Sequence, residues 1–168
     1  RARFEPGQAI RGGVPVCWPW FGPVPLDQGR PAHGFARQRP WALRQSAGGS
    51  DGTTRLTLAL SDDAATRALW PHAFELRLDI RVGRTLRLSL STRNTGDTAF
   101  TITQALHSYF AVAHIDTVEV LGLEGCGFVD KLPGAPARGG PAHQPLRFHG
   151  RLDRIYQPAR QRLQVLGA

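Results

Sequence analysis

The sequence predicts an all-β protein built from antiparallel strands. Between Thr54 and Val120, polar and apolar residues alternate, and a period of two places successive side chains on opposite faces of a strand. Turn-forming residues separate these segments. Only residues 62–69 have the pattern of a helix, which Ser61 could cap. We therefore expect a single domain over residues 1–168 with one sizeable core.

The clearest strand is Phe74–Val82, whose five apolar residues face a core while Glu75, Arg77, Asp79 and Arg81 face water or a neighbouring sheet. The turn at Gly83–Arg84 predicts a hairpin with the strand that follows. The same pattern continues before and after this hairpin, at Leu56, Leu58, Leu60, Leu86, Leu88, Leu90, Phe100, Ile102, Val118 and Val120, with a further turn at 94–97.

Two stretches, residues 5–41 and 132–146, are rich in Gly and Pro and predict irregular structure. The first also carries Trp18, Trp20, Phe21, Phe35 and Trp41, which is unusual for a linker. Loops with large rings and scattered Arg and His, supported by an antiparallel sheet, often line a ligand cleft.

The basic character of the chain favours a small anionic ligand over nucleic acid. The net charge is +8, but the arginines are spread along the chain and no block of like charges occurs. Arginine is suited to bidentate binding of a phosphate. No apolar run is long enough for a membrane span or a signal peptide, so we expect a soluble, cytoplasmic protein.

Cysteine and histidine usage argues against a metal centre. Cys17 and Cys126 are far apart and form no CxxC pair, so they are expected to be reduced, structural thiols. The histidines show no HxH, HExxH or Cys/His spacing. His72, His143 and His149 are interpreted as structural or incidental.

Chemistry-bearing residues gather in short segments. A lone histidine beside apolar residues is more often structural than catalytic. The segment at residues 10–22 can be explained equally well as a Gly/Pro turn with aromatic packing or as a ligand-binding loop. In combination, however, the segments are specific. They are IRGGVPVCWPWFG (10–22), PAHGFAR (31–37), WPHAF (70–74), ALHSYF (105–110) and DRIY (153–156).

Together and in this order, these strings resemble the glucose-6-phosphate 1-epimerase branch of the aldose 1-epimerase superfamily. The resemblance implies a galactose-mutarotase-like antiparallel β-sandwich whose cleft binds a pyranose. It also implies that His107 is the general acid, that Asp153 holds the sugar, and that Arg11, His33 and Arg37 line the site. The arginines would neutralise the phosphate of a hexose 6-phosphate.

The implied activity is an isomerase reaction that exchanges the α and β anomers of a hexose 6-phosphate. A base removes the proton of the anomeric hydroxyl while an acid protonates the ring oxygen, and the opened sugar rotates about one bond and recloses. Imidazole, with an unperturbed pKa of about 6.5, can give and regain that proton. This chemistry needs no cofactor and no metal, and the partner is a small sugar phosphate.

The family's general base is a glutamate nearer the C-terminus than the motifs present here, and none of Asp116, Glu119, Glu124 or Asp130 sits in a matching motif. The chain is therefore expected to be a fragment, cut at both ends, of a longer domain, with edges that pair or aggregate if left uncovered. Two alternatives remain open at this stage. One is an inactive sugar-phosphate-binding protein of the same fold, and the other is a β-sandwich interaction module unrelated to sugars.

Overall fold

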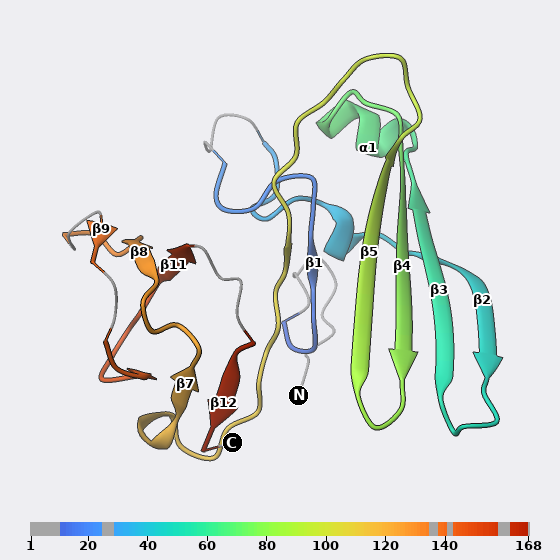
Figure 1. Ribbon diagram of the computed structural model, residues 1–168. Helices are drawn as coiled ribbons and strands as arrows, with labels where there is room; N and C mark the ends of the chain where they lie inside the picture. Colours follow the sequence, from blue (N-terminus) through green and yellow to red (C-terminus); the bar gives the residue numbers. More distant parts are fainter. Residues whose placement is uncertain (1–10, 25–28, 135–137, 141–142, 158–161, 168) are drawn as a thin grey trace. The chain divides into compact units, whose positions relative to one another are not determined.

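The computed structural model describes residues 11–24, 29–134, 138–140, 143–157 and 162–167. They divide into two compact units, Arg1–Tyr109 and Phe110–Ala168, which are described separately (Figure 1). The single domain expected over residues 1–168 stays a prediction. Residues 5–10 and 25–28 of the first irregular stretch, and 135–137 and 141–142 of the second, lie outside the described residues.

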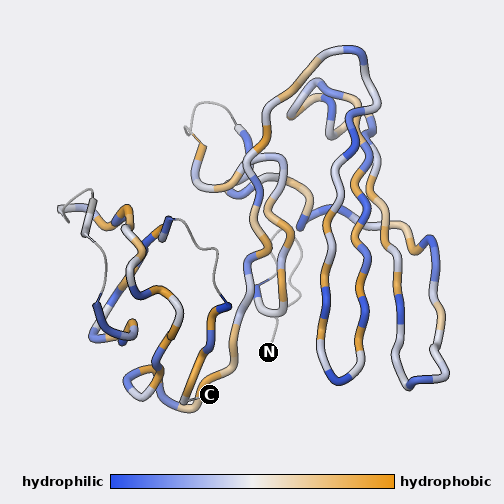
Figure 2. The backbone as a smooth tube through the Cα atoms, viewed as in Figure 1, coloured by the Kyte–Doolittle hydropathy of each residue, from blue (hydrophilic) through white to orange (hydrophobic). Residues whose placement is uncertain are grey.

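The first unit is built on a four-stranded antiparallel sheet with the strand order β2-β3-β4-β5. Its strands are β2 (Ala42–Gly48), β3 (Thr54–Ser61), β4 (Phe74–Val82) and β5 (Leu86–Asn94). The hairpin predicted at Gly83–Arg84 is confirmed, because β4 and β5 pair in register from Phe74↔Asn94 to Val82↔Leu86. Figure 2 shows the alternation of apolar and polar residues along these strands.

One face of the sheet packs on an aromatic core, as the period of two predicts. Phe74, Leu76 and Leu78 of β4 are buried, whereas Arg77 and Arg81 between and beyond them are exposed. Trp18, fully buried, is at the centre of the core. Its ring lies 5.8 Å from Phe35, 5.1 Å from Trp70 and 4.5 Å from Phe74, measured between ring centroids.

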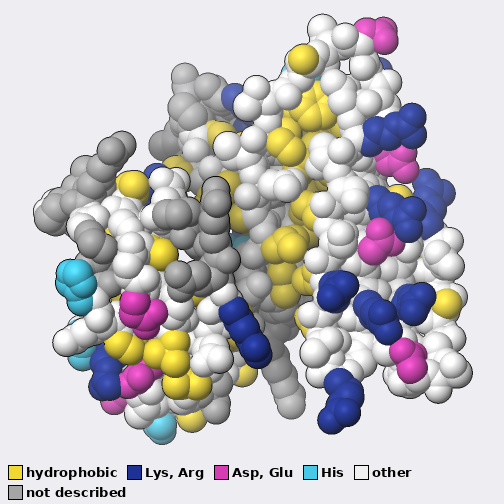
Figure 3. Space-filling model, in the orientation of Figure 1, with side chains coloured by type: hydrophobic (Ala, Val, Ile, Leu, Met, Phe, Trp, Pro, Cys, Tyr) yellow, Lys and Arg dark blue, Asp and Glu magenta, His cyan; other side chains and the backbone are white. Residues whose placement is uncertain are grey.

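The opposite face of the sheet is polar and rich in arginine (Figure 3). Arg55 of β3 lies opposite Arg81 of β4, which lies opposite Arg87 of β5. Arg81 is paired with Asp51 at 3.0 Å. The strands therefore gather charges that are widely spaced in the sequence into one row across three strands.

The helix is shorter than predicted and has a different cap. Helix α1 spans Ala64–Leu69, and Asp63 caps it in a capping box with Thr66. The predicted cap, Ser61, is instead the last residue of β3, where it pairs with Glu75. Asp63 is the cap because its carboxylate accepts the Thr66 N–H at 2.6 Å, while the Thr66 hydroxyl accepts the Asp63 N–H at 2.8 Å.

The alternation suggested that Phe100 and Ile102 continue the strand pattern, but neither residue lies in a strand. They lie in an irregular segment after β5 and pack, partly buried, against the core. The first unit is completed by the 3₁₀ helix η2 (Ala36–Gln38) and by the short strands β1 (Val16–Cys17) and β6 (Ala105–Leu106).

The second unit contains two three-stranded antiparallel sheets, β10-β7-β12 and β11-β8-β9. Val120 lies in β7, as predicted, and Val118 is buried just before it. The elements are the 3₁₀ helix η3 (Ile115–Thr117), β7 (Glu119–Leu121), β8 (Gly127–Asp130), β9 (Arg138–Gly139), β10 (Leu146–Arg147), β11 (Arg154–Gln157) and β12 (Gln164–Leu166). Strand β9 thus lies within the stretch 132–146 that was expected to be irregular, and β10 begins at the last residue of that stretch.

A cross-strand ion pair links two strands of the second unit. Arg154 donates through Nε to Asp130 at 2.9 Å, and its guanidinium lies 4.1 Å from the centre of the Phe128 ring. The hydrogen bond from Arg154 is the main reason that the pKa of Asp130 is lowered.

Candidate active site

Strands β1 and β6 bring two distant motifs side by side. Val16 pairs with Leu106 and Cys17 with Ala105. Backbone hydrogen bonds extend this pairing beyond the two strands, because the His107 N–H donates to the Pro15 carbonyl at 3.0 Å and the Tyr109 N–H donates to the Gly13 carbonyl at 2.9 Å. His107 is therefore held opposite Pro15, and Tyr109 opposite Gly13, in the segment that follows Arg11.

The PAHGFAR segment is anchored to the same motif through Trp18. The Trp18 carbonyl accepts the N–H groups of Phe35 and Ala36 at 3.0 and 3.2 Å, and Trp18 forms a parallel bridge with Gly34. Gly34 has a φ of +70°, and a Cβ there would lie 2.0 Å from the Trp18 carbonyl oxygen. Only glycine fits this approach.

His33 is fixed by two hydrogen bonds with Gly22. Its N–H donates to the Gly22 carbonyl at 2.9 Å, and its ring Nδ1 accepts the Gly22 N–H at 3.2 Å. A φ of +63° places His33 in the left-handed region, which is uncommon for residues other than glycine. The surrounding hydrogen bonds hold this backbone in place.

The two histidines of the motifs lie together, with ring centroids 6.4 Å apart. An aromatic ring accompanies each of them, Phe21 at 5.0 Å from His33 and Tyr109 at 4.9 Å from His107. Both aromatic side chains are more than two-fifths exposed. The cluster thus presents two imidazoles and two rings at the surface, an arrangement that can bind a ligand with both polar and apolar faces.

The surroundings of His33 favour its neutral form. Burial is the main cause of its lowered pKa, and the positive charges of Arg37, His107 and Arg11 lower that pKa further. A neutral imidazole that accepts at Nδ1 carries its proton on Nε2. His33 can therefore donate a hydrogen bond to a ligand oxygen through Nε2.

Arg37 lies beside the segment Gly12–Val16, and one of the N–H groups of its guanidinium is not used in a hydrogen bond to any described residue. Its Nη2 donates to the Ala32 carbonyl at 3.0 Å, but its buried Nε has no hydrogen-bond partner among the residues that the structure describes. A buried N–H without an acceptor is costly and is a site where a ligand can bind. Burial raises the pKa of the neighbouring Cys17 thiol more than Arg37 lowers it, so Cys17 remains protonated.

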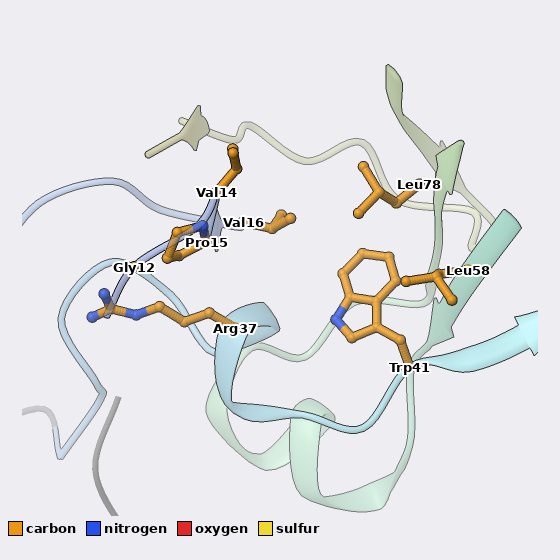
Figure 4. A pocket seen from close by; sticks show the side chains of 8 residues that line it. All are labelled: Gly12, Val14, Pro15, Val16, Arg37, Trp41, Leu58 and Leu78. Atoms are coloured by element: carbon orange, nitrogen blue, oxygen red, sulfur yellow. The ribbon is translucent and has the colours of Figure 1, made fainter. Parts of the chain in front are cut away.

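A hollow of about 240 Å³ adjoins Arg37. In Figure 4 the Arg37 guanidinium lies at its Gly12 end, while Trp41, Leu58 and Leu78 lie at the other end. The lining is mostly apolar and contains neither His33 nor His107. The hollow is therefore lined by different residues from the cluster of His33, His107, Phe21 and Tyr109.

The remaining predicted residues are Arg11, in the first unit, and Asp153, in the second. Arg11 is exposed, and its charge acts on His33. Asp153 is in the second unit, just before β11, with an exposed side chain and a carbonyl that accepts the Lys131 N–H at 2.7 Å. Its part in the site stays a prediction.

The other histidines and the cysteines do not build a further centre. The His72 ring packs at a tilt against Trp70, with ring centroids 4.4 Å apart, and His143 and His149 are exposed in the second unit. Both cysteines are buried, and no disulfide joins them. Within the described ranges, no three His, Cys, Asp or Glu side chains lie close enough to hold a metal ion.

Sequence reasoning named Phe21 only as one of several rings in a loop, and it missed Tyr109 and Thr103. The two rings lie inside the recognised motifs, so their position was a usable signal. Thr103 lies just before the ALHSYF motif, and its hydroxyl accepts the Phe21 N–H at 2.9 Å, a contact that no local pattern indicates.

Fold and site define the class: an all-β protein of antiparallel sheets whose loops gather histidines and arginines at one surface. The chain belongs to the aldose 1-epimerase family, since the family model for aldose 1-epimerase matches residues 2–166. Its fold is galactose-mutarotase-like, as the crystal structure of a "putative mutarotase" from Salmonella typhimurium also shows, with a TM-score of 0.81 and 42% identity over 92% of this chain and 50% of that one.

Two curated relatives share much of the sequence. A "Putative glucose-6-phosphate 1-epimerase" of Salmonella typhimurium is 44% identical over 91% of this chain and 49% of its own length. A protein of the same name from Escherichia coli is 48% identical over 77% of this chain and 42% of its own length. The chain therefore spans about half the length of the curated relatives it matches.

No helix in the described part of the chain has the length and apolar character needed to cross a membrane. The cytoplasmic location expected from the sequence stays a prediction.

Proposed function

We propose that the protein is a mutarotase that interconverts the α and β anomers of a hexose 6-phosphate by acid–base ring opening. The observation that carries this proposal is the convergence of His33 and His107, 6.4 Å apart, beside the Arg37 guanidinium that retains an unused buried N–H. Family membership and the names of the curated relatives support it.

In this reaction His107 acts as the general acid and His33 as a hydrogen-bond donor. His107 gives a proton to the ring oxygen as the bond between that oxygen and the anomeric carbon breaks, and the anomeric hydroxyl loses its proton to a base. The free aldehyde rotates about its bond to the next carbon, and the same transfers in reverse close the ring. His33, protonated at Nε2, donates a hydrogen bond to a sugar oxygen.

Recognition of the phosphate falls to Arg37 and Arg11, since guanidinium groups bind phosphate oxygens in a fork. Asp153 is proposed to hold a sugar hydroxyl. We assign no residue as the base.

Exchange NMR between the two anomeric protons of glucose 6-phosphate tests the proposal. The protein should accelerate the exchange, and His107→Gln should lower that acceleration by about 10²-fold or more, the usual contribution of a positioned acid. His149→Gln, an exposed histidine of the second unit, is the matched control and should leave the rate unchanged.

The alternative functions give different results in the same experiment. Saturable binding of glucose 6-phosphate without any acceleration would identify an inactive binding protein. If the protein neither binds glucose 6-phosphate nor accelerates the exchange, sugar phosphates are not its ligands. The interaction module would then be the remaining alternative.

A further inference from the structure

A chain of hydrogen bonds leads from Thr103 to the ring of His33. The Thr103 N–H donates to the Pro19 carbonyl at 3.0 Å, and its hydroxyl accepts the Phe21 N–H at 2.9 Å. The following N–H along the chain, that of Gly22, donates to Nδ1 of His33 at 3.2 Å. Residues 82 positions apart, Phe21 and Thr103, are thus joined directly behind the site.

This chain of hydrogen bonds restricts the loop at Phe21 and Gly22, which contacts the His33 ring. With Phe21 held at its N–H, the Gly22 peptide can reorient only through the two backbone dihedrals of Phe21. The Phe21 side chain packs on the same imidazole at 5.0 Å, so a shift of the loop would also move that contact. Gly22 itself has a φ of +105° and no side chain to pack, so this loop is held through backbone hydrogen bonds, from the Phe21 N–H to Thr103 and from the His33 N–H to the Gly22 carbonyl.

We propose that Thr103 is a positioning residue for His33: its hydroxyl anchors Phe21 so that the Gly22 N–H meets Nδ1 and the ring presents Nε2–H to the ligand. The catalytic consequence rests on the proposed function. The hydrogen bonding of the His33 ring does not depend on the proposed function, because it exists without any sugar present.

The pairing of Nδ1 with a donor also has a titration signature. A protonated ring carries a hydrogen on Nδ1 and must give up the Gly22 bond, so this bond favours the neutral ring. The other groups that act on His33 are the guanidinium groups of Arg37 and Arg11 and the ring of His107, all of them cationic or able to become so. Loss of the Gly22 bond should therefore raise the pKa of His33.

Thr103→Val tests the proposal, since it removes the hydroxyl with little change of shape. Hydrogen exchange at the Gly22 amide should become roughly two- to tenfold faster, the effect of one ordinary hydrogen bond. The ¹⁵N spectrum of His33 should lose the through-bond coupling between Gly22 N and Nδ1. Thr103→Ser, which keeps the hydroxyl, should restore both signals, and Thr101→Val, an exposed neighbour, should change neither.

Several outcomes would overturn the proposal. They are a wild-type His33 without coupling to Gly22, a valine variant whose ring signals match wild type, or a serine variant that behaves as valine. If the valine variant does not fold, the wild-type coupling and the serine variant still decide. None of these measurements uses substrate. The role of Thr103 would therefore stand even if the protein did not accelerate anomer exchange, and a failure of the Thr103 proposal would leave the proposed mutarotase activity untouched.

Discussion

At the scale of single residues, the candidate site contains residues in energetically unfavourable states. His33 adopts a left-handed backbone and a lowered pKa, and Arg37 keeps a buried N–H without an acceptor. Features of this kind cost stability and persist where the surrounding structure imposes them. Their concentration within one loop cluster is the physical reason for the proposal that a ligand binds there.

Arg37 should discriminate a sugar phosphate from a plain sugar. Arg37→Gln should weaken glucose 6-phosphate by about 10- to 100-fold, because charge-assisted hydrogen bonds are lost, and should affect glucose about twofold or less. Titration calorimetry with both sugars measures this difference. Arg39→Gln, two residues along and without an interaction with His33, is the matched control. An equal loss for both sugars would assign Arg37 a structural role.

The convergence of His33 with His107 could be predicted only through the family resemblance. Composition and periodicity place these residues on separate loops, and nothing local indicates that β1 and β6 pair. The role of Thr103 could not be predicted in this way, because it depends on a hydroxyl that meets a backbone N–H far away in the sequence.

At the scale of elements, the sequence predicts strands well where one face is buried. Strands β3, β4 and β5 alternate clearly, because a half-buried sheet requires it. Strand β2 was missed because its residues, ALRQSAG, show no alternation, and all seven are exposed at the edge of the sheet. The helix cap was misplaced for a related reason, since Ser61 is a good cap by type but is needed as the last residue of β3.

The arginine row across β3, β4 and β5 should lower the stability of the sheet. Like charges directly opposite one another in antiparallel strands repel, so Arg87→Glu should stabilise the first unit by about 0.2–1 kcal/mol through attraction to Arg81. Urea unfolding followed by tryptophan fluorescence measures this change. Fluorescence reports on the first unit alone, because all four tryptophans lie there, at positions 18, 20, 41 and 70.

Two controls separate pairing from net charge. Arg87→Gln removes the repulsion without adding attraction and should give a smaller gain. Arg84→Glu changes the net charge equally but lies in the β4–β5 turn, away from the row. If Arg84→Glu stabilised the first unit as much as Arg87→Glu, the cross-strand account would be wrong.

At the scale of the molecule, the lowered pKa values of the first unit predict a stability that falls in two steps as the pH drops. Below pH 6.5, roughly the pKa of an unfolded histidine, the unfolded chain binds a proton that native His33 resists, so the free energy of unfolding decreases. Below about pH 4 the carboxylates follow. Burial alone would raise the pKa of Asp62, but the Phe74 N–H and Arg67 together lower it, and Arg77 with Thr57 lowers that of Asp79.

Each lowered pKa contributes stability that is present above the unfolded value and is lost as the pH falls through the native one. Urea unfolding across this pH range, again read by tryptophan fluorescence, should therefore show a plateau above about pH 7 followed by the two declines. His33→Asn should abolish the first decline and keep the second, because asparagine tolerates the left-handed backbone and does not titrate. His149→Gln, in the second unit, should retain both. A first decline that persists in His33→Asn would show that another group titrates there and that His33 is not held neutral by its surroundings.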